Sequence, residues 1–136
     1  MKKGFTLIEL LAVIVILAII ALIATPIILG IIEDARTEAK QRTAELVASA
    51  VELAYTSYLF DNAKTGAVPA DACDFMTKEH FSMDNGKLND CAADATTTTV
   101  EASGVTFTVS YDGGVATITP AEGSGVEVET VKLATS

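Results

Sequence analysis

The stretch GFTLIELLAVIVILAIIALIATPIILGII, residues 4–32, decides the fold of this chain. From residue 5 to residue 32 it runs for 28 positions with one ionisable side chain, Glu9. Because about 20 apolar helical residues cross the hydrocarbon of a bilayer, residues 5–32 predict a membrane-spanning helix. Lys2 and Lys3 precede this helix, and basic residues mark the cytoplasmic flank of a span. We therefore expect the rest of the chain to lie outside the membrane.

Glu9 does not fit a simple membrane anchor. A carboxylate at the centre of a bilayer costs roughly 2.5 to 3.5 kcal/mol on insertion scales, so it needs a partner or a route to water. One interpretation places Glu9 shallowly, where its side chain reaches the headgroups. The other gives it a cationic partner on a second helix. A buried pair of this kind acts as a register device, because a wrong stagger leaves a charge unpaired.

The residues KKGFTLIEL, positions 2–10, resemble the N-terminus of type IV pilins and pseudopilins. The resemblance implies that a membrane peptidase cuts between Gly4 and Phe5, so that residues 1–4 form a leader and Phe5 becomes the N-methylated first residue. It also implies that Glu9 assembles subunits by pairing with the new amine of a neighbour. An ordinary secretory signal peptide fits less well, because the apolar run is about twice too long and lacks an Ala-x-Ala cut site.

A single helix is expected from residue 5 to residue 60. Its second half, from Glu33, is rich in Ala, Glu, Lys and Leu, which favour helices. A stripe at spacings of three and four should face the C-terminal part of the chain; it consists of Val47, Val51, Ala54 and Tyr58. Pro26 removes one helical hydrogen bond, which predicts a kink or a local opening. The resemblance implies loss of helical order there in assembled fibres, and a tolerated kink is the alternative.

Residues 61–99 read as a long connecting region with repeated turn signals and a short helix around 74–81. Cys73 and Cys91 are the only cysteines, and in an oxidising compartment such a pair predicts a disulfide; two free thiols are the alternative. A metal site with His80 lacks a fourth ligand, so His80 is interpreted as a solvated loop residue. The run Thr96–Thr99 leaves a loop, an edge strand and a glycosylation site open.

The last third predicts a three-stranded antiparallel sheet in a globular head of residues 61–136. Apolar and polar residues alternate in 105–111, and Asp112-Gly113 leads into 115–119. A two-residue type I′ turn at Asp112-Gly113 would place Phe107 opposite Ile118 and Val109 opposite Ala116. Residues 126–133 supply the third strand, whose shift in apolar phase predicts a bulge near Thr130. The expected fold class is α+β, pilin-like, with the second half of the helix packed on this sheet.

Composition excludes several classes of function. From residue 61 to 136 there are twelve acidic residues and four lysines, a formal charge of −8, which argues against nucleic-acid binding by the head. The sequence shows no glycine-rich phosphate loop, no nucleophile with a base and no metal-ligand cluster. We therefore expect neither an enzyme nor a cofactor, and no catalytic or metal-binding residues.

The resemblance implies a subunit that polymerises with copies of itself through the N-terminal helix. The implied partners are the prepilin peptidase, a membrane assembly platform and its ATPase. The chain would sit in the cytoplasmic membrane as a single-pass precursor with its N-terminus inside, and in an extracellular pilus after assembly. Two alternatives stay open. One is a pseudopilin of a type II secretion or DNA-uptake machine, and the other is a membrane-anchored surface binding module that does not polymerise.

Overall fold

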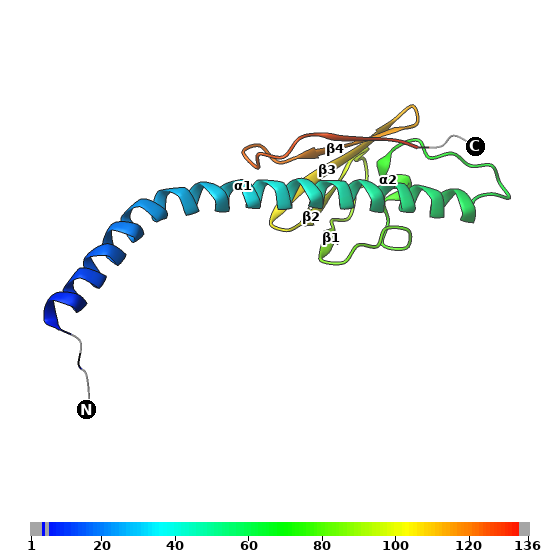
Figure 1. Cartoon of the computed structure of the whole chain (residues 1–136). Coiled ribbons are helices and arrows are strands. Elements are labelled where there is room, and N and C mark those ends of the chain that lie inside the picture. Colours follow the sequence, from blue (N-terminus) through cyan, green and yellow to red (C-terminus); the bar gives the residue numbers. More distant parts are fainter. Residues whose placement is uncertain (1–3, 5, 134–136) are drawn as a thin grey trace. The chain divides into compact units, whose positions relative to one another are not determined.

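The computed structural model describes residues 4 and 6–133 and shows a long helix and an antiparallel sheet (Figure 1). The predicted α+β fold class is confirmed. Helix α1 spans Leu7–Asp61. The chain divides into two compact units, one ending at Arg36 and the other beginning at Thr37. The second unit contains the C-terminal half of α1, a short helix and the whole sheet, and it is called the head below.

Helix α1 continues through Pro26. Residues on both sides of the proline, and the proline itself, are helical, so the local opening allowed by the sequence is absent from this single chain. The missing amide leaves one helical hydrogen bond unmade. The hydroxyl of Thr25 donates to the carbonyl oxygen of Ala21 at 2.7 Å, which satisfies that polar side chain within the helix. A loss of helical order at Pro26 in an assembled fibre stays a prediction.

The sheet has five strands, so the prediction of three was wrong. The strands lie in the order β1-β2-β3-β4-β5 with antiparallel neighbours. Their bounds are β1 Gly86–Leu88, β2 Thr98–Ala102, β3 Val105–Asp112, β4 Val115–Pro120 and β5 Glu129–Lys132. The two additional strands come from or adjoin the region expected to be a connection. Strand β1 is only three residues long, and the apolar side of β2 begins with a buried threonine, Thr98, so neither shows a clear alternation in sequence.

The β3–β4 hairpin is displaced from the predicted register by two residues. Asp112 pairs with Val115, so the two-residue loop is Gly113-Gly114. Both glycines have positive φ, 55° and 88°, as the central residues of a type I′ turn require. Val109 consequently pairs with Ile118, and Phe107 pairs with Pro120. A shift of two keeps every side chain on its original face, which is why apolar pairing alone did not distinguish the two registers.

Strand β5 is shorter than predicted and has no bulge. It pairs with β4 in one continuous register from Glu129 opposite Ile118 to Lys132 opposite Val115. Residues 126–128 precede the strand and are not part of the ladder. The shift in apolar phase at Thr130 therefore marks where the strand begins, rather than an extra residue within it.

The core of the head lies between α1 and one face of the sheet. Val47, Val51 and Ala54 are buried as predicted, whereas Tyr58 is only half-buried and its place is taken by Tyr55. The sheet contributes a set of fully buried side chains, namely Val100, Phe107, Val109, Ala116 and Ile118.

An aromatic cluster closes one end of this core. The ring of Phe75 packs edge-on against Tyr55 and Tyr111, with centroid distances of 5.4 and 5.5 Å. Phe75 belongs to α2, Ala72–Phe75, which replaces the short helix predicted around 74–81. Asp71 caps this helix by accepting the backbone N–H of Cys73 at 2.9 Å. Burial raises the pKa of Tyr55 to about 12, and the neighbouring Tyr111 phenol adds to the rise.

His80 is not the solvated residue that the sequence suggested. Its side chain is only 10% exposed, and its ring packs edge-on against Tyr58 at 5.8 Å. Nδ1 lies 3.2 Å from the hydroxyl oxygen of Ser57 and 3.5 Å from a carboxylate oxygen of Asp61. His80 thus ties the loop after α2 to the end of α1. The interpretation failed because loop residues near a helix end become buried when the loop folds back on the helix.

Candidate functional site

The N-terminal end of α1 has a threonine N-cap that sequence reasoning missed. Thr6 precedes the first helical residue, and its hydroxyl oxygen accepts the backbone N–H of Glu9 at 3.2 Å. The carbonyl oxygen of Thr6 accepts the N–H of Leu10 at 3.1 Å. A threonine directly before an apolar helix is a common N-cap, and the position of Thr6 is the signal that the sequence offered. The first helical residue, Leu7, therefore follows the predicted cut site by two residues.

Of the two residues at that cut site, the structure describes one. Gly4 is exposed and lies outside the helix, whereas Phe5 falls outside the described residues. Cleavage between Gly4 and Phe5 and methylation of Phe5 stay predictions.

Glu9 lies in the first turn of α1 with an exposed side chain. Within residues 4 and 6–133 its carboxylate has no hydrogen-bond or ion-pair partner, although its backbone N–H is capped. A carboxylate at a helix N-terminus is stabilised by the helix dipole by only about 0.3 to 1 kcal/mol. That is less than the cost of placing it in hydrocarbon, so in an apolar environment Glu9 needs either a route to water or a cationic partner.

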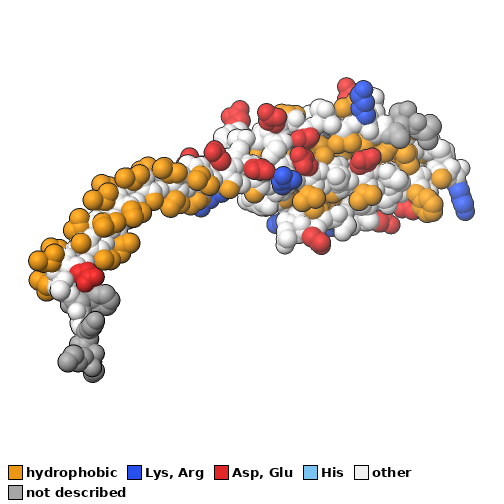
Figure 2. Space-filling view, in the orientation of Figure 1, with side chains coloured by type: hydrophobic (Ala, Val, Ile, Leu, Met, Phe, Trp, Pro, Cys, Tyr) orange, Lys and Arg blue, Asp and Glu red, His pale blue; other side chains and the backbone are white. Residues whose placement is uncertain are grey.

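The apolar segment, residues 7–32, exposes its large side chains on every face of the helix. Its mean hydropathy reaches 3.2 over 18 residues, and none of that window is buried. Figure 2 shows the segment covered by hydrophobic side chains, whereas the head mixes acidic, basic and polar groups with small apolar patches. Single chains in water do not keep so large an apolar surface exposed. The segment therefore needs lipid or other helices around it.

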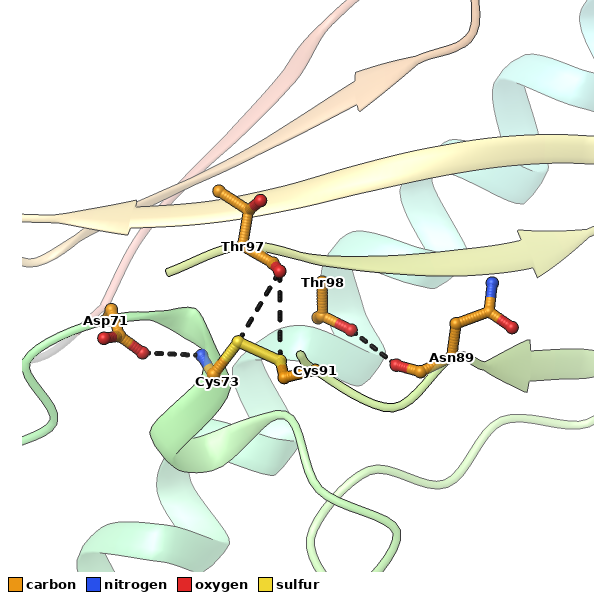
Figure 3. The surroundings of a disulfide bond; sticks show 6 residues. All are labelled: Asp71, Cys73, Asn89, Cys91, Thr97 and Thr98. Carbon is orange, nitrogen blue, oxygen red and sulfur yellow. Dashed lines mark hydrogen bonds between the residues drawn. A yellow bond between two sulfur atoms is a disulfide. The ribbon is translucent and has the colours of Figure 1, made fainter. Parts of the chain in front are cut away.

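The disulfide between Cys73 and Cys91 is present and confirms the predicted pairing (Figure 3). It joins α2 to the loop that leads from β1 into β2. Both sulfurs lie near the carbonyl oxygen of Thr97, at 3.5 Å from Cys73 and 3.9 Å from Cys91. The bridge therefore fixes the start of β2 as well as α2.

Asn89 also holds the start of β2 in place, through two hydrogen bonds. Its carbonyl oxygen accepts the hydroxyl of Thr98 at 2.7 Å, and its amide nitrogen donates to the hydroxyl oxygen of Thr99 at 2.9 Å. Thr98 and Thr99 thus lie in β2, an inner strand of the sheet, and their hydroxyls are hydrogen-bonded. Of the run Thr96–Thr99, only Thr96 and Thr97 lie in an exposed loop.

The head has no catalytic arrangement that its described residues would support. Ser57, His80 and Asp61 meet, but the serine and the carboxylate approach the same imidazole nitrogen, Nδ1. A catalytic triad requires them on opposite nitrogens. Within residues 4 and 6–133, no group of three His, Cys, Asp or Glu side chains is placed to hold a metal ion.

Comparison with known families gives one match. Residues 1–25 match the model of the prokaryotic N-terminal methylation motif, which covers the predicted cut site, Glu9 and most of the apolar segment. No curated protein and no solved structure matches the chain significantly. Together with the unburied apolar helix, the motif marks the chain as a membrane-anchored precursor.

Proposed function

Since residues 1–25 carry the class III prepilin signal of the type IV pilin and pseudopilin family, we propose that this chain is a structural subunit of a type IV pilus. The precursor is cut between Gly4 and Phe5, methylated at Phe5 and polymerised through α1. The observation that supports this proposal best is the exposed apolar segment, residues 7–32, which carries the unpartnered Glu9 in its first turn. The processing peptidase, an assembly platform and its ATPase are the partners that such a subunit requires.

Polymerisation is favourable for this segment because helices of other copies can replace lipid around it. Lipid tails and leucine side chains are similarly apolar, so transfer from a bilayer into a bundle of identical helices loses little apolar burial. Packing between the helices then decides the equilibrium. One segment thus serves as the membrane anchor of the precursor and as the core of the fibre.

Glu9 gives the polymer its register. After cleavage, the amine of Phe5 and the carboxylate of Glu9 lie four residues apart along each chain, so one helix must be shifted along its axis for its amine to reach a neighbour's carboxylate. Each charge alone is costly in an apolar bundle, whereas a hydrogen-bonded pair removes most of that cost. Helices that depart from this shift leave both charges unpaired. The carboxylate therefore selects one stagger of neighbouring helices.

The experiment compares Glu9→Ala with the unaltered chain in cells that carry the assembly machinery. Mass spectrometry of the mature N-terminus should find methylated Phe5 in both proteins, because the cut site is unchanged. Sheared fibres should be strongly reduced in the variant alone. Glu122→Ala, which removes an exposed carboxylate from the loop after β4 in the head, is the matched control and should give normal fibres. Normal fibres from Glu9→Ala would refute the role of Glu9, and an uncut chain would refute the proposal as a whole.

A pseudopilin of a secretion or DNA-uptake machine is the second candidate, because the motif at residues 1–25 is common to both groups. The two functions differ in the amount of polymer. A pilus subunit is the main component of sheared surface fibres, whereas a pseudopilin stays mostly in the cell envelope. Quantifying the chain in both fractions separates the two candidates. A permanently anchored binding module would appear in neither sheared fibres nor envelope polymers.

A further inference from the structure

The sheet has an outer face, on the side opposite the core, that is lined with hydroxyl groups. Because side chains alternate along a strand, the neighbours of the buried core residues point to this side. All of them are exposed or half-buried. The hydroxyl-bearing residues among them, called the hydroxyl face below, are Thr99, Thr106, Thr108, Ser110, Thr117, Thr119 and Thr130.

Strand pairing arranges most of the hydroxyl face in two rows that cross the sheet. One row is Thr99, Thr108 and Thr119, and the next is Ser110, Thr117 and Thr130. Neighbours in a row are about 4.8 Å apart and the rows about 6.7 Å apart, so the hydroxyls form a regular grid. Thr99 accepts a hydrogen bond from the amide of Asn89, and the other hydroxyls have no hydrogen-bond partner within the described chain.

The outer face carries no net charge. Lys87 and Glu101 lie opposite each other at one end of it, and Asp112 and Lys132 lie at the other end. These charges cancel, so the formal charge of −8 of residues 61–136 lies elsewhere on the head. Threonine is common in strands, so the hydroxyls alone would indicate little. An uncharged, hydroxyl-rich face on an acidic head is the feature that indicates a ligand.

A shallow depression of about 430 Å³ lies at the Lys87 end of the outer face. It is lined by Asn85, Lys87, Glu101, Ala102, Ser103, Gly104 and Thr106. Within the part of the chain that the structure describes, the side chains of Asn85, Lys87 and Glu101 have no hydrogen-bond or ion-pair partner. Glu101 is the only carboxylate in this lining, because Asp84 lines a different groove beside α1. The depression therefore offers both donors and acceptors to a ligand.

These properties indicate which chemistry the face binds. A hydroxyl both donates and accepts, so the grid matches a partner that also presents hydroxyl groups. An anionic partner, such as nucleic acid or a second head, would be repelled by the acidic surface around a neutral face. An apolar partner would leave the covered hydroxyls without hydrogen bonds, which is costly. A glycan built of uncharged sugars meets all three conditions.

We infer that the hydroxyl face and the adjoining depression bind a strand of neutral glycan. The inference goes beyond the proposed function and does not depend on it, because the face lies wholly in the head. The outer-face residues of the five strands include no aromatic side chain on which a sugar ring could stack. Binding therefore depends on hydrogen bonds, and replacing hydroxyls by methyl groups of the same shape should weaken it.

The test measures retention of the full chain, in a detergent without sugar headgroups, on beads of chitin, amylose, dextran and, as an acidic polysaccharide, alginate. Thr108→Val/Thr117→Val removes two hydroxyls from the grid and keeps branched side chains that suit strands. Thr56→Val/Thr65→Val is the matched control, since both threonines are exposed outside the sheet. Lys87→Glu keeps the grid but unbalances the charge of the face. Circular dichroism checks that each variant is folded.

We expect the unaltered chain and the control to be retained on at least one neutral polymer. The Thr108→Val/Thr117→Val variant should bind about fivefold less or weaker, as the loss of two hydrogen bonds predicts. Lys87→Glu should also bind less, which keeps the inference testable if the valine variant misfolds.

The inference is wrong if no neutral polymer retains the chain, if alginate retains it equally well, or if both double variants bind alike. Sedimentation of the same samples tests a second copy as the occupant. Loss of association between copies in the valine variant, without retention of the unaltered chain on neutral polymers, would assign the face to a subunit contact and overturn the inference.

Discussion

Removal of the disulfide should destabilise the head by about 3 kcal/mol. Cys73 and Cys91 are 18 positions apart, and their Cα atoms are 6.0 Å apart. Closing a loop of this length lowers the entropy of the unfolded chain by an amount worth about 3 kcal/mol at 25 °C. The double variant Cys73→Ser/Cys91→Ser regains that entropy when it unfolds. Its serines meet solvent, because both cysteines are partly exposed, so little additional cost from burying hydroxyl groups is expected.

The free energy of unfolding would be measured by urea titration of the full chain in mild detergent, followed by circular dichroism of the sheet. A thermal melt of the same samples gives a second measure. For a unit the size of the head, a loss of 1 kcal/mol lowers the Tm by roughly 4 to 8 °C, so the Tm of the double variant should fall by roughly 12 to 24 °C. The unaltered chain treated with a reductant is the matched comparison, since it also lacks the bridge but keeps both sulfur atoms.

The loss of unfolding free energy in the serine variant and the loss in the reduced, unaltered chain should agree within about 1 kcal/mol. A difference of that size is the usual effect of replacing a partly exposed side chain. A loss below about 1 kcal/mol in both would refute the reasoning, because the unfolded chain would then not be limited by this loop. A large loss in the serine variant alone would assign the effect to native contacts of the sulfurs, such as those near the carbonyl oxygen of Thr97.

Two further predictions concern polar groups of the head. Gln41 donates to Glu129 at 2.8 Å and accepts the N–H of Glu127 at 2.9 Å, so Gln41→Ala should lower the free energy of unfolding by roughly 1 to 3 kcal/mol in the same urea assay. Arg42→Ala, at the exposed neighbouring residue, should change the free energy of unfolding by less than about 0.5 kcal/mol. Equal effects of the two variants would show that the two hydrogen bonds of Gln41, called the Gln41 clamp below, do not stabilise the head. The pKa of Tyr55 is raised from 10.0 to about 12, because the folded head favours the neutral phenol. The contribution of this phenol to the free energy of unfolding is therefore fully present below pH 10 and is lost as the pH rises towards 12. This loss amounts to roughly 3 kcal/mol and should be missing in Tyr55→Phe, whereas an unchanged pH dependence of unfolding in that variant would show that another group titrates.

The sequence correctly predicted those elements whose residue pattern strongly favours a single structure. A run such as residues 5–32, with one charge, has no stable arrangement other than a helix among apolar neighbours, and α1 at Leu7–Asp61 agrees with this. The alternation in 105–111 likewise specified which face of β3 is buried. The pairing of Cys73 with Cys91 followed from there being no other cysteine. In each case the residues favoured one structure over its alternatives, which for the two cysteines were free thiols.

The errors arose where two structures satisfy the same pattern. Turns at Asp112-Gly113 and at Gly113-Gly114 bury identical faces, and the second was selected because glycine occupies both positions of positive φ. Tyr55 and Tyr58 lie three residues apart and both fit an inward-facing stripe, and Tyr55 is the buried one because it packs against Phe75 of α2. His80 was misplaced for a related reason, since the contact that buries it lies 23 residues away at Ser57.

The stability of the head and the function of the apolar segment depend on different interactions. The head is held by a core between α1 and the sheet, the disulfide and the Gln41 clamp, and all of these contacts are satisfied within one chain. The apolar segment and the carboxylate of Glu9 have no such contacts among the described residues of their own chain. A substitution in the head should therefore lower the stability of each subunit, whereas a substitution at Glu9 should leave the subunit folded and change only its assembly. Fibre yield and urea stability, measured on the same variants, distinguish the two sets of interactions.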